Sequence, residues 1–180
     1  MPDFNFDKES HTYFLDGRVI PSVTQILAKS GILDNRFFKA GAAERGTSVH
    51  EQCERIANGL EIEAENGYTS AFRSFLNDSK IEPVEIETQY YSKLGFAGTL
   101  DLIAVFRGEL VLIDIKTGIY QEWWQLQLAG YSLLIGNENI RRFSLGIKEN
   151  GKYKFSEYQN KKEDTAGFLS AFETYKQLYC

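Results

Sequence analysis

The sequence has few cysteines, histidines and prolines, and it lacks any long run of apolar residues. It contains two cysteines, two histidines and three prolines among 180 residues. Cys53 and Cys180 are far apart and stand alone, which argues against a disulfide framework and favours a reducing compartment. No stretch approaches the roughly 18 consecutive apolar residues of a membrane span, so no membrane partner is expected.

Targeting and charge features are also sparse. The segment Met1–Asp7 is acidic and has no basic region before an apolar one, so we expect no targeting peptide and a cytoplasmic location. The net charge of −5 does not by itself favour nucleic acid, although an enzyme that binds phosphate through metal ions tolerates an acidic chain. Residues 141–162 differ, because they hold seven of the basic residues and only two acidic ones. This basic segment either follows a nucleic-acid backbone or is a solvated surface; its cations are Arg141, Arg142, Lys148, Lys152, Lys154, Lys161 and Lys162.

Composition and periodicity predict one globular domain. Hydrophobic residues make up 43% of the chain and charged residues 25%, which is ordinary for a soluble domain. We expect a single domain over 1–180, with an N-terminal hairpin and helix (1–40), a core (41–160) and a C-terminal helix (161–180). Helices are predicted over 23–28, 42–58, 70–77, 123–135 and 163–178, and strands over 13–15, 19–20, 84–91, 97–106, 110–116, 142–148 and 152–158. The predicted fold is therefore α/β, a mixed sheet flanked by helices.

The most informative motif is Gly-Thr-Leu-Asp at 98–101 followed by Ile-Asp-Ile-Lys at 113–116. The two segments are predicted to be adjacent strands joined by a short turn, which places Asp101 across from Asp114. Side chains alternate along a strand, so Asp114 and Lys116 share one face. Two carboxylates beside an ammonium are costly to bury unless a cation and an anion join them. The pattern predicts a divalent metal and a phosphate at this end of the sheet.

Other candidate residues admit two interpretations each. His50 lies near the start of a predicted helix, where a lone histidine is more often structural than a ligand. Gln127 and Tyr131 share one face of an apolar helix, where they form ordinary buried hydrogen bonds or orient groups at the site. Trp123 and Trp124 begin that helix, and each either packs in the core or stacks on an unpaired base for ~1–3 kcal/mol.

Two apparent motifs are rejected. Residues 146–152 nearly match the phosphate loop GxxxxGK[ST], but Tyr153 replaces the hydroxyl residue and a strand follows where the loop requires a helix. A hairpin turn explains this segment better, so no nucleotide is expected. Cys53 follows His50 by three residues, yet no second Cys/His pair completes a zinc site. His11 is assigned no functional role.

Together these residues resemble the PD-(D/E)XK nuclease superfamily, specifically its RecB-like branch, over most of the chain. The family has an upstream histidine, often an acidic residue on the first strand, a metal-binding aspartate, a (D/E)-x-K element and a Q-x-x-x-Y helix. The matching residues are His50, Glu87, Asp101, Asp114 with Lys116, and Gln127 with Tyr131. The resemblance implies a restriction-endonuclease-like core with the order helix-strand-strand-strand-helix-strand.

The resemblance further implies a metal-dependent deoxyribonuclease that hydrolyses phosphodiester bonds with Mg²⁺ or Mn²⁺. The implied metal ligands are His50, Asp101, Asp114 and the backbone carbonyl of Ile115, and the nitrogen ligand shifts the preference towards Mn²⁺. Lys116 would orient and help activate the attacking water, so that Asp101, Asp114 and Lys116 form the catalytic set. The substrate and supporting contacts would come from Glu87, Gln127, Tyr131, Trp123 and Trp124.

Within this branch, residues 21–27 resemble the mitochondrial genome maintenance exonuclease and related phage exonucleases. The implied activity is removal of nucleotides from the ends of single-stranded DNA in repair, recombination or replication, and a phage origin is compatible with it. Leu100 replaces the proline of the family name, and the absence of two further cysteines excludes the iron–sulfur cluster of some relatives. The alternatives left open are a double-strand exonuclease or endonuclease of the same fold and an inactive nucleic-acid-binding module.

Overall fold

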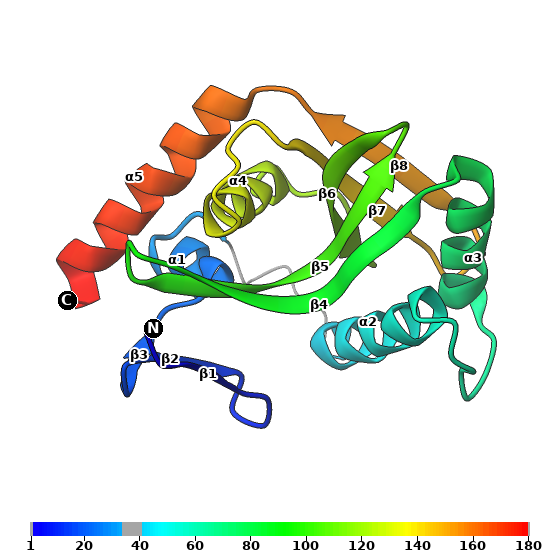
Figure 1. Cartoon of the computed structure of the whole chain (residues 1–180), viewed down its shortest axis with the longest axis horizontal. Helices are drawn as coiled ribbons and strands as arrows, with labels where there is room; N and C mark the ends of the chain where they lie inside the picture. The colour runs from blue at the N-terminus through cyan, green and yellow to red at the C-terminus, as the bar shows by residue number, and fades with distance from the viewer. Residues whose placement is uncertain (1, 34–40, 180) are drawn as a thin grey trace.

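The computed structural model describes residues 2–33 and 41–179, which form two β-sheets and five helices (Figure 1). The elements are β1 (Phe4–Asp7), β2 (Thr12–Leu15), β3 (Arg18–Ile20), α1 (Val23–Lys29), α2 (Ala42–Ala57), α3 (Gly67–Ser79), β4 (Glu82–Ser92), β5 (Phe96–Phe106), β6 (Glu109–Lys116), α4 (Trp124–Leu134), β7 (Arg141–Ile147), β8 (Tyr153–Tyr158) and α5 (Lys161–Tyr179). Cys180 and the end of the predicted 1–40 segment, residues 34–40, lie outside the described residues.

The larger sheet has five strands in the order β4-β5-β6-β7-β8. All neighbouring strands are antiparallel except β6 and β7, which run parallel. A parallel pair needs a crossover connection, and α4 supplies it. The order α3-β4-β5-β6-α4-β7 confirms the predicted core, and the mixed sheet confirms the predicted fold class.

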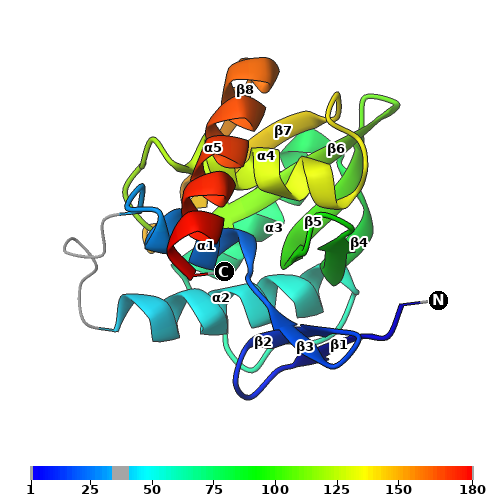
Figure 2. The same cartoon turned by 90° about the vertical axis from the view of Figure 1, so that its left-hand side faces the viewer.

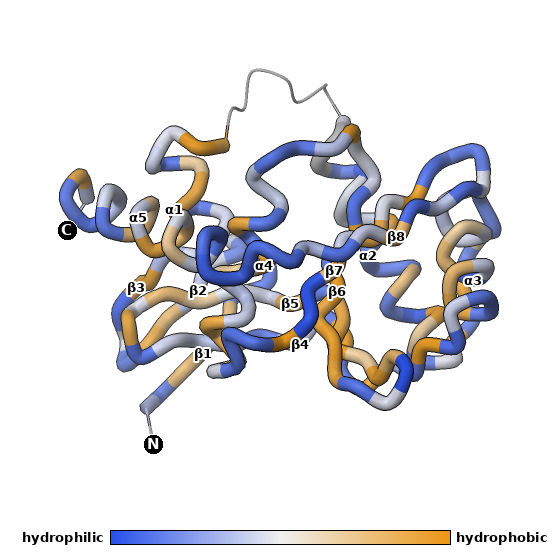
Figure 3. Tube along the Cα trace, turned by 90° about the horizontal axis from the view of Figure 1, so that it is seen from above, coloured by the Kyte–Doolittle hydropathy of each residue, from blue (hydrophilic) through white to orange (hydrophobic). Residues whose placement is uncertain are grey.

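Helices cover both faces of this sheet and create two cores (Figures 1 and 2). α1, α4 and α5 pack on one face through residues such as Leu128 and Phe168. α2 and α3 pack on the other face through residues such as Val49 and Phe72. β5 and β6 contribute to both cores, which explains their nearly continuous apolar sequence and their hydrophobic colouring near the hairpin turn in Figure 3. Within the described ranges, no helix has the length and apolar character that crossing a membrane requires.

The predicted N-terminal hairpin is confirmed as β2 and β3, and the unpredicted strand β1 extends it to a three-stranded sheet. β1 pairs antiparallel with β2, with Phe4 opposite Leu15 and Phe6 opposite Tyr13. The Phe6 ring stacks on the Tyr13 ring at 4.6 Å between centroids. This aromatic packing supplies the contact area that lets a four-residue strand form.

Side-chain caps determine where two helices begin. Ser22 caps α1 in a capping box with Gln25. α3 begins at Gly67 because Asn66 accepts hydrogen bonds from the amides of Tyr68 and Thr69, so the predicted start at residue 70 is three residues late.

The large sheet divides near its middle. Pairing between β5 and β6 ends at Leu102 opposite Ile113, although β6 continues beside β7 to Lys116. Beyond this point the free edge of β5 pairs with the segment before α1, where the Ala97 amide donates to the Pro21 carbonyl at 2.9 Å. We call the separation between β5 and β6 the fork.

The close packing of α3 against the β7–β8 turn predicts opposite effects for two glycine substitutions. A Cβ at Gly67 would overlap the backbone carbonyl of Glu149, whereas a Cβ at Gly46 in α2 would have no atom of the described residues within 4 Å. Gly67→Ala should lower the free energy of unfolding by about 1–3 kcal/mol despite the better helix propensity of alanine. Gly46→Ala should raise the free energy of unfolding by up to about 1 kcal/mol. Urea titrations of both variants measure the two changes. Equal effects of the two substitutions would contradict this packing.

Candidate active site at the fork of the sheet

Three metal-ligating side chains converge at the fork: His50 from α2, Glu87 from β4 and Asp101 from β5. One ligand atom from each lies within 4.8 Å of the others. His50 Nδ1 is 3.2 Å from Glu87 Oε1 and 3.4 Å from Asp101 Oδ1. The Asp101 side chain is 8% exposed, whereas the His50 and Glu87 side chains are 27% and 23% exposed, so the group opens to solvent on one side. The structure thus brings together three residues that are distant in sequence.

The backbone of Ile115 connects this group to β6. Its amide donates to Asp101 Oδ2 at 2.6 Å, and its carbonyl lies 3.1 Å from His50 Nε2, which donates to it. If β5 were still paired with β6 here, the amide and the carbonyl of Ile115 would hydrogen-bond to the backbone of β5. The pairing of the two strands has already ended at Ile113. A hydrogen bond from one ring nitrogen to a carbonyl fixes the orientation of the imidazole and leaves Nδ1 directed at the carboxylates. Ile115 therefore positions both residues.

Glu87 occupies a strained backbone conformation. It lies between Ile86 and Thr88, which pair with Leu102 and Leu100, so it is opposite Asp101. Its φ is +48°, in the left-handed region, which costs roughly 1–2 kcal/mol for a residue other than glycine. At this level β5 also changes face, because Leu100 packs in the core of α4 and α5 while Leu102 packs in the core of α2 and α3.

Asp114 and Lys116 share a face of β6, as predicted, and form an ion pair of 2.6 Å between Oδ2 and Nζ. Asp114 is 2% exposed, and its Oδ2 has no donor in hydrogen-bond alignment among the described residues. The predicted placement of Asp101 directly against Asp114 is altered by the fork, because Asp101 bonds to the Ile115 amide instead.

Helix α4 holds the lysine in place. Lys116 Nζ donates to Gln127 Oε1 at 2.6 Å, and Gln127 Nε2 donates to the Tyr131 hydroxyl at 2.8 Å. The same nitrogen lies 3.3 Å from Thr24 Oγ1 of α1. The Trp123 and Trp124 rings lie 5.2 and 5.7 Å from Lys116 Nζ. Trp124 is buried and Trp123 is half-buried, so both pack beside the lysine.

Burial and neighbouring charges perturb the titration of these groups. Burial lowers the pKa of His50, but the Asp101 and Glu87 carboxylates outweigh it and hold that pKa well above its usual value. Burial raises the pKa of Glu87. Burial opposes ionisation of Asp101 as well, but His50, Lys116 and the Ile115 amide lower its pKa. Burial and the nearby Asp101 charge raise the pKa of Asp114 to about 6 despite the Lys116 ammonium.

The donor set fits a divalent cation. It offers carboxylate oxygens from Glu87 and Asp101 with one imidazole nitrogen from His50, whereas the predicted ligand Asp114 is not in this group and pairs with Lys116. Oxygen ligands with a single nitrogen suit Mg²⁺ or Mn²⁺ better than zinc. Cys53 does not join this set, because it is buried in the core of α2 and α3.

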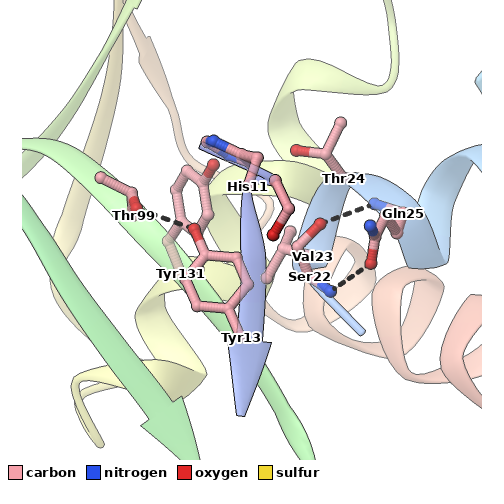
Figure 4. Close-up of a pocket in the computed structure, with 10 residues that line it drawn as sticks. His11, Tyr13, Ser22, Val23, Thr24, Gln25, Thr99 and Tyr131 are labelled. Atoms are coloured by element: carbon pink, nitrogen blue, oxygen red, sulfur yellow. Dashed lines mark hydrogen bonds between the residues drawn. The ribbon is translucent and has the colours of Figure 1, made fainter. Parts of the chain in front are cut away.

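A pocket of about 280 Å³ lies beside the site, between the small sheet and α1 (Figure 4). Its hydroxyl groups come from several elements, and Tyr13 and Thr99 are joined by a hydrogen bond of 2.7 Å. It is lined by Ser10, His11, Tyr13, Ser22, Val23, Thr24, Gln25, Gly98, Thr99 and Tyr131. Tyr131 and Thr24 both contact Gln127, so the pocket adjoins the lysine.

The sequence did not identify this pocket. Thr99 stands two residues before Asp101 on the same strand, and Ser22 and Thr24 lie in the segment that begins α1. Hydroxyl residues are common on such elements, so only the spatial arrangement distinguishes them. Likewise, Glu87 was predicted as a supporting contact, and the structure places it in the metal-ligating group itself.

The basic segment does not behave as one surface. Arg141 bonds to Glu157 at 2.7 Å and lies 3.3 Å from Glu109. Arg142 is fully buried and bonds to Asp164 at 2.9 Å. Neither interpretation of the basic segment therefore holds for Arg142, which is neither available to a nucleic-acid backbone nor part of a solvated surface. The Asn150-Gly151 hairpin turn is confirmed between β7 and β8, with Gly151 at a φ of +77°.

Comparisons with known proteins find similarity in structure only. No protein-family model matches the chain, and no curated protein matches it. The alkaline exonuclease LHK-Exo from Laribacter hongkongensis is 12% identical, with a TM-score of 0.44 over 87% of this chain and 89% of that one. A protein from Eubacterium rectale, provisionally named an exonuclease, is 11% identical, with a TM-score of 0.48 over 85% of this chain and 71% of that one. With so few identical residues, the functional conclusion depends on the site itself.

The raised pKa of Asp114 predicts a pH-dependent cost to stability. The unfolded carboxyl ionises near 3.8 and the folded one near 6, so folding weakens as pH rises between these values and the full cost is present above 6. In EDTA at pH 8, Asp114→Asn should unfold at higher urea, with a gain on the order of 2–3 kcal/mol. The gain should shrink towards pH 4.5. An exposed acid, Glu122, replaced by glutamine serves as the control, and a pH-independent effect of Asp114→Asn would refute the prediction.

Proposed function

We propose that this chain is a divalent-metal-dependent DNA exonuclease that hydrolyses phosphodiester bonds from the ends of single-stranded DNA. The observation that supports it most is the convergence of His50, Glu87 and Asp101 at the fork, next to the buried Asp114–Lys116 pair. An acidic group that binds a cation, placed beside an ammonium that binds an anion, suits a substrate whose reacting group is a phosphate. The unaccompanied cysteines suit action in a reducing compartment such as the cytoplasm.

Mg²⁺ or Mn²⁺ would be held by His50, Glu87 and Asp101, with Asp114 and the Ile115 carbonyl as the further predicted ligands. The imidazole favours Mn²⁺, because nitrogen suits magnesium poorly. When bound, the ion neutralises charge on the scissile phosphate and makes a coordinated water more acidic.

Lys116 is the residue that we assign to the attacking water. Its ammonium is held by Asp114 and Gln127 and bordered by Trp123, so it has a fixed position beside the metal group. In this position it orients the water and offsets phosphate charge. Gln127 holds the lysine directly, while Tyr131 holds Gln127.

The pocket beside the site supports a preference for strand ends. The small sheet, α1, β5 and α4 line it, and its volume of about 280 Å³ is limited. A small pocket lined by four elements suits the end of a strand better than a continuous chain that must pass through. Its hydroxyl groups and the Tyr13 ring offer hydrogen bonds and an aromatic surface to a terminal nucleotide.

An inactive binding module is the second candidate. The buried Asp114–Lys116 pair argues against it, because a buried charge pair is costly and a module without chemistry gains nothing from it. A duplex-specific enzyme of the same fold is the third candidate, and the experiments below separate it from the proposal.

Loss of the lysine should remove turnover and spare binding. Lys116→Ala should reduce hydrolysis of end-labelled single-stranded DNA by roughly 10²–10⁴-fold, because the lysine acts on the reacting water. Binding of the same DNA in EDTA should change far less. Lys93→Gln, a surface lysine on the β4–β5 turn, is the charge control. Turnover by Lys116→Ala within a few-fold of the parent would reject the role of the lysine. Parent activity that survives EDTA would reject the proposed metal dependence.

The topology of the DNA should decide whether it is degraded. With Mn²⁺, linear single-stranded DNA should disappear faster than duplex, and circular single strands should survive because they have no end to enter the pocket. Gel analysis of matched linear and circular substrates measures this directly. Rapid nicking of the circles would exclude an exonuclease, and faster loss of duplex would favour the third candidate.

A further inference from the structure

The ends of β6, β7 and β8 carry a row of residues that the proposed reaction leaves partly unused. The strand register pairs Lys116 with Gly146, and Gly146 with Lys154. Paired residues share a face, and adjacent strands are about 4.8 Å apart, so the Cα atoms of the two lysines are roughly 10 Å apart on one face. This is the face of α4 and α5, because Leu112 and Tyr158, farther along the same strands, pack against that core. We call Lys116, Gly146 and Lys154 the lysine row.

The lysine row is uncovered at Gly146 and Lys154, whereas Lys116 and the sheet next to the row are not. A Cβ built on Gly146 would have one neighbour within 4 Å among the described residues, the Lys154 carbonyl at 3.7 Å. Lys154 is exposed. Ser144 is the next residue of β7 on the same face, on the side towards the helices. It is 3% exposed, and its hydroxyl lies 3.0 Å from the hydroxyl of Tyr158. Helix α4 therefore reaches Lys116, but the helices stop short of Gly146 and Lys154 and leave an open strip beside Lys116.

Lys154 differs from the arginines of the basic segment in its surroundings. Arg141 and Arg142 are neutralised by carboxylates, but Lys154 has no ion-pair partner in the part of the chain that the structure describes. It is also the cation that the register aligns with Lys116. An exposed ammonium aligned with the proposed catalytic lysine, across a glycine, suits a chain of phosphates that continues past the site.

We propose that Lys154 binds a backbone phosphate of the substrate strand, and that Gly146 keeps the path from Lys116 to Lys154 open. The identity of this ligand as DNA rests on the proposed function. The pocket beside the site is lined by residues of β5, whereas Lys154 lies on β8, at the opposite edge of the sheet from β4. The strand therefore crosses the sheet from the pocket, over Lys116 and Gly146, to Lys154. The remaining cations of the segment are not needed for this path.

The test measures binding of a fluorescent oligo(dT) of roughly 12 nucleotides to the full chain in EDTA, across a salt series. Lys154→Gln should weaken binding by roughly 3- to 10-fold at low salt and reduce the log–log salt slope by about 0.7, the value for one single-strand phosphate contact. Lys154→Arg should retain the parent slope. Lys93→Gln, on a turn at the opposite end of the molecule from β8 in Figure 1, should leave both quantities unchanged.

A second variant tests the open path without changing charge. Gly146→Val adds a side chain that the strand conformation accommodates, since its Cβ makes only an ordinary contact and β-branched residues favour strands. It should raise the KM for single-stranded DNA several-fold while the melting temperature stays the same or rises.

The outcomes separate the two proposals. An unchanged salt slope in Lys154→Gln, with an active parent enzyme, overturns the role of Lys154 and leaves the nuclease intact. A reduced slope with a parent that does not cleave DNA retains the lysine row and rejects the nuclease. Equal losses in Lys154→Gln and Lys93→Gln would indicate nonspecific charge attraction and overturn the lysine row.

Discussion

The candidate site depends on two polar backbone groups of Ile115 that lose their strand partners at the fork. A buried amide or carbonyl left without a partner costs about 1–3 kcal/mol. Asp101 accepts from the amide and His50 donates to the carbonyl, so the two residues replace the missing strand. Replacing a strand with side chains brings a carboxylate and an imidazole to one point. The local demand for hydrogen bonds thus assembles the group that could hold a metal ion.

Several features of the site oppose stability and persist because other contacts compensate. Glu87 has a left-handed backbone inside a strand, and Asp114 is buried where ionisation is unfavourable. Strain and unfavourable burial of this kind cluster where a protein needs a fixed arrangement of charges. The surrounding sheet supplies the compensation, because β5 and β6 are buried between two helical layers. A rigid apolar frame therefore holds these acidic side chains close together.

The sequence predicted the elements well because their patterns are local. Alternation and apolar runs located the five strands of the large sheet and α4, although they missed β1, and the (D/E)-x-K spacing correctly placed Asp114 and Lys116 on one face. Long-range effects were missed. A count of basic residues could not show that Arg141 and Arg142 would be neutralised by acidic residues of other elements. These acids are Glu157, Glu109 and Asp164. Nor could the pattern of β5 show that its pairing with β6 would end at Leu102.

The small N-terminal sheet is coupled to the site through β5. Tyr13 is 2% exposed, and its hydroxyl bonds to Thr99, two residues before Asp101. Thr24 of α1 reaches Gln127, which in turn holds Lys116. These contacts join residues 86 and 103 positions apart in the chain, so they form only when the whole domain is folded. The N-terminal segment consequently closes the pocket and also fixes both β5 and the lysine, which makes it part of the site and not an appendage to it.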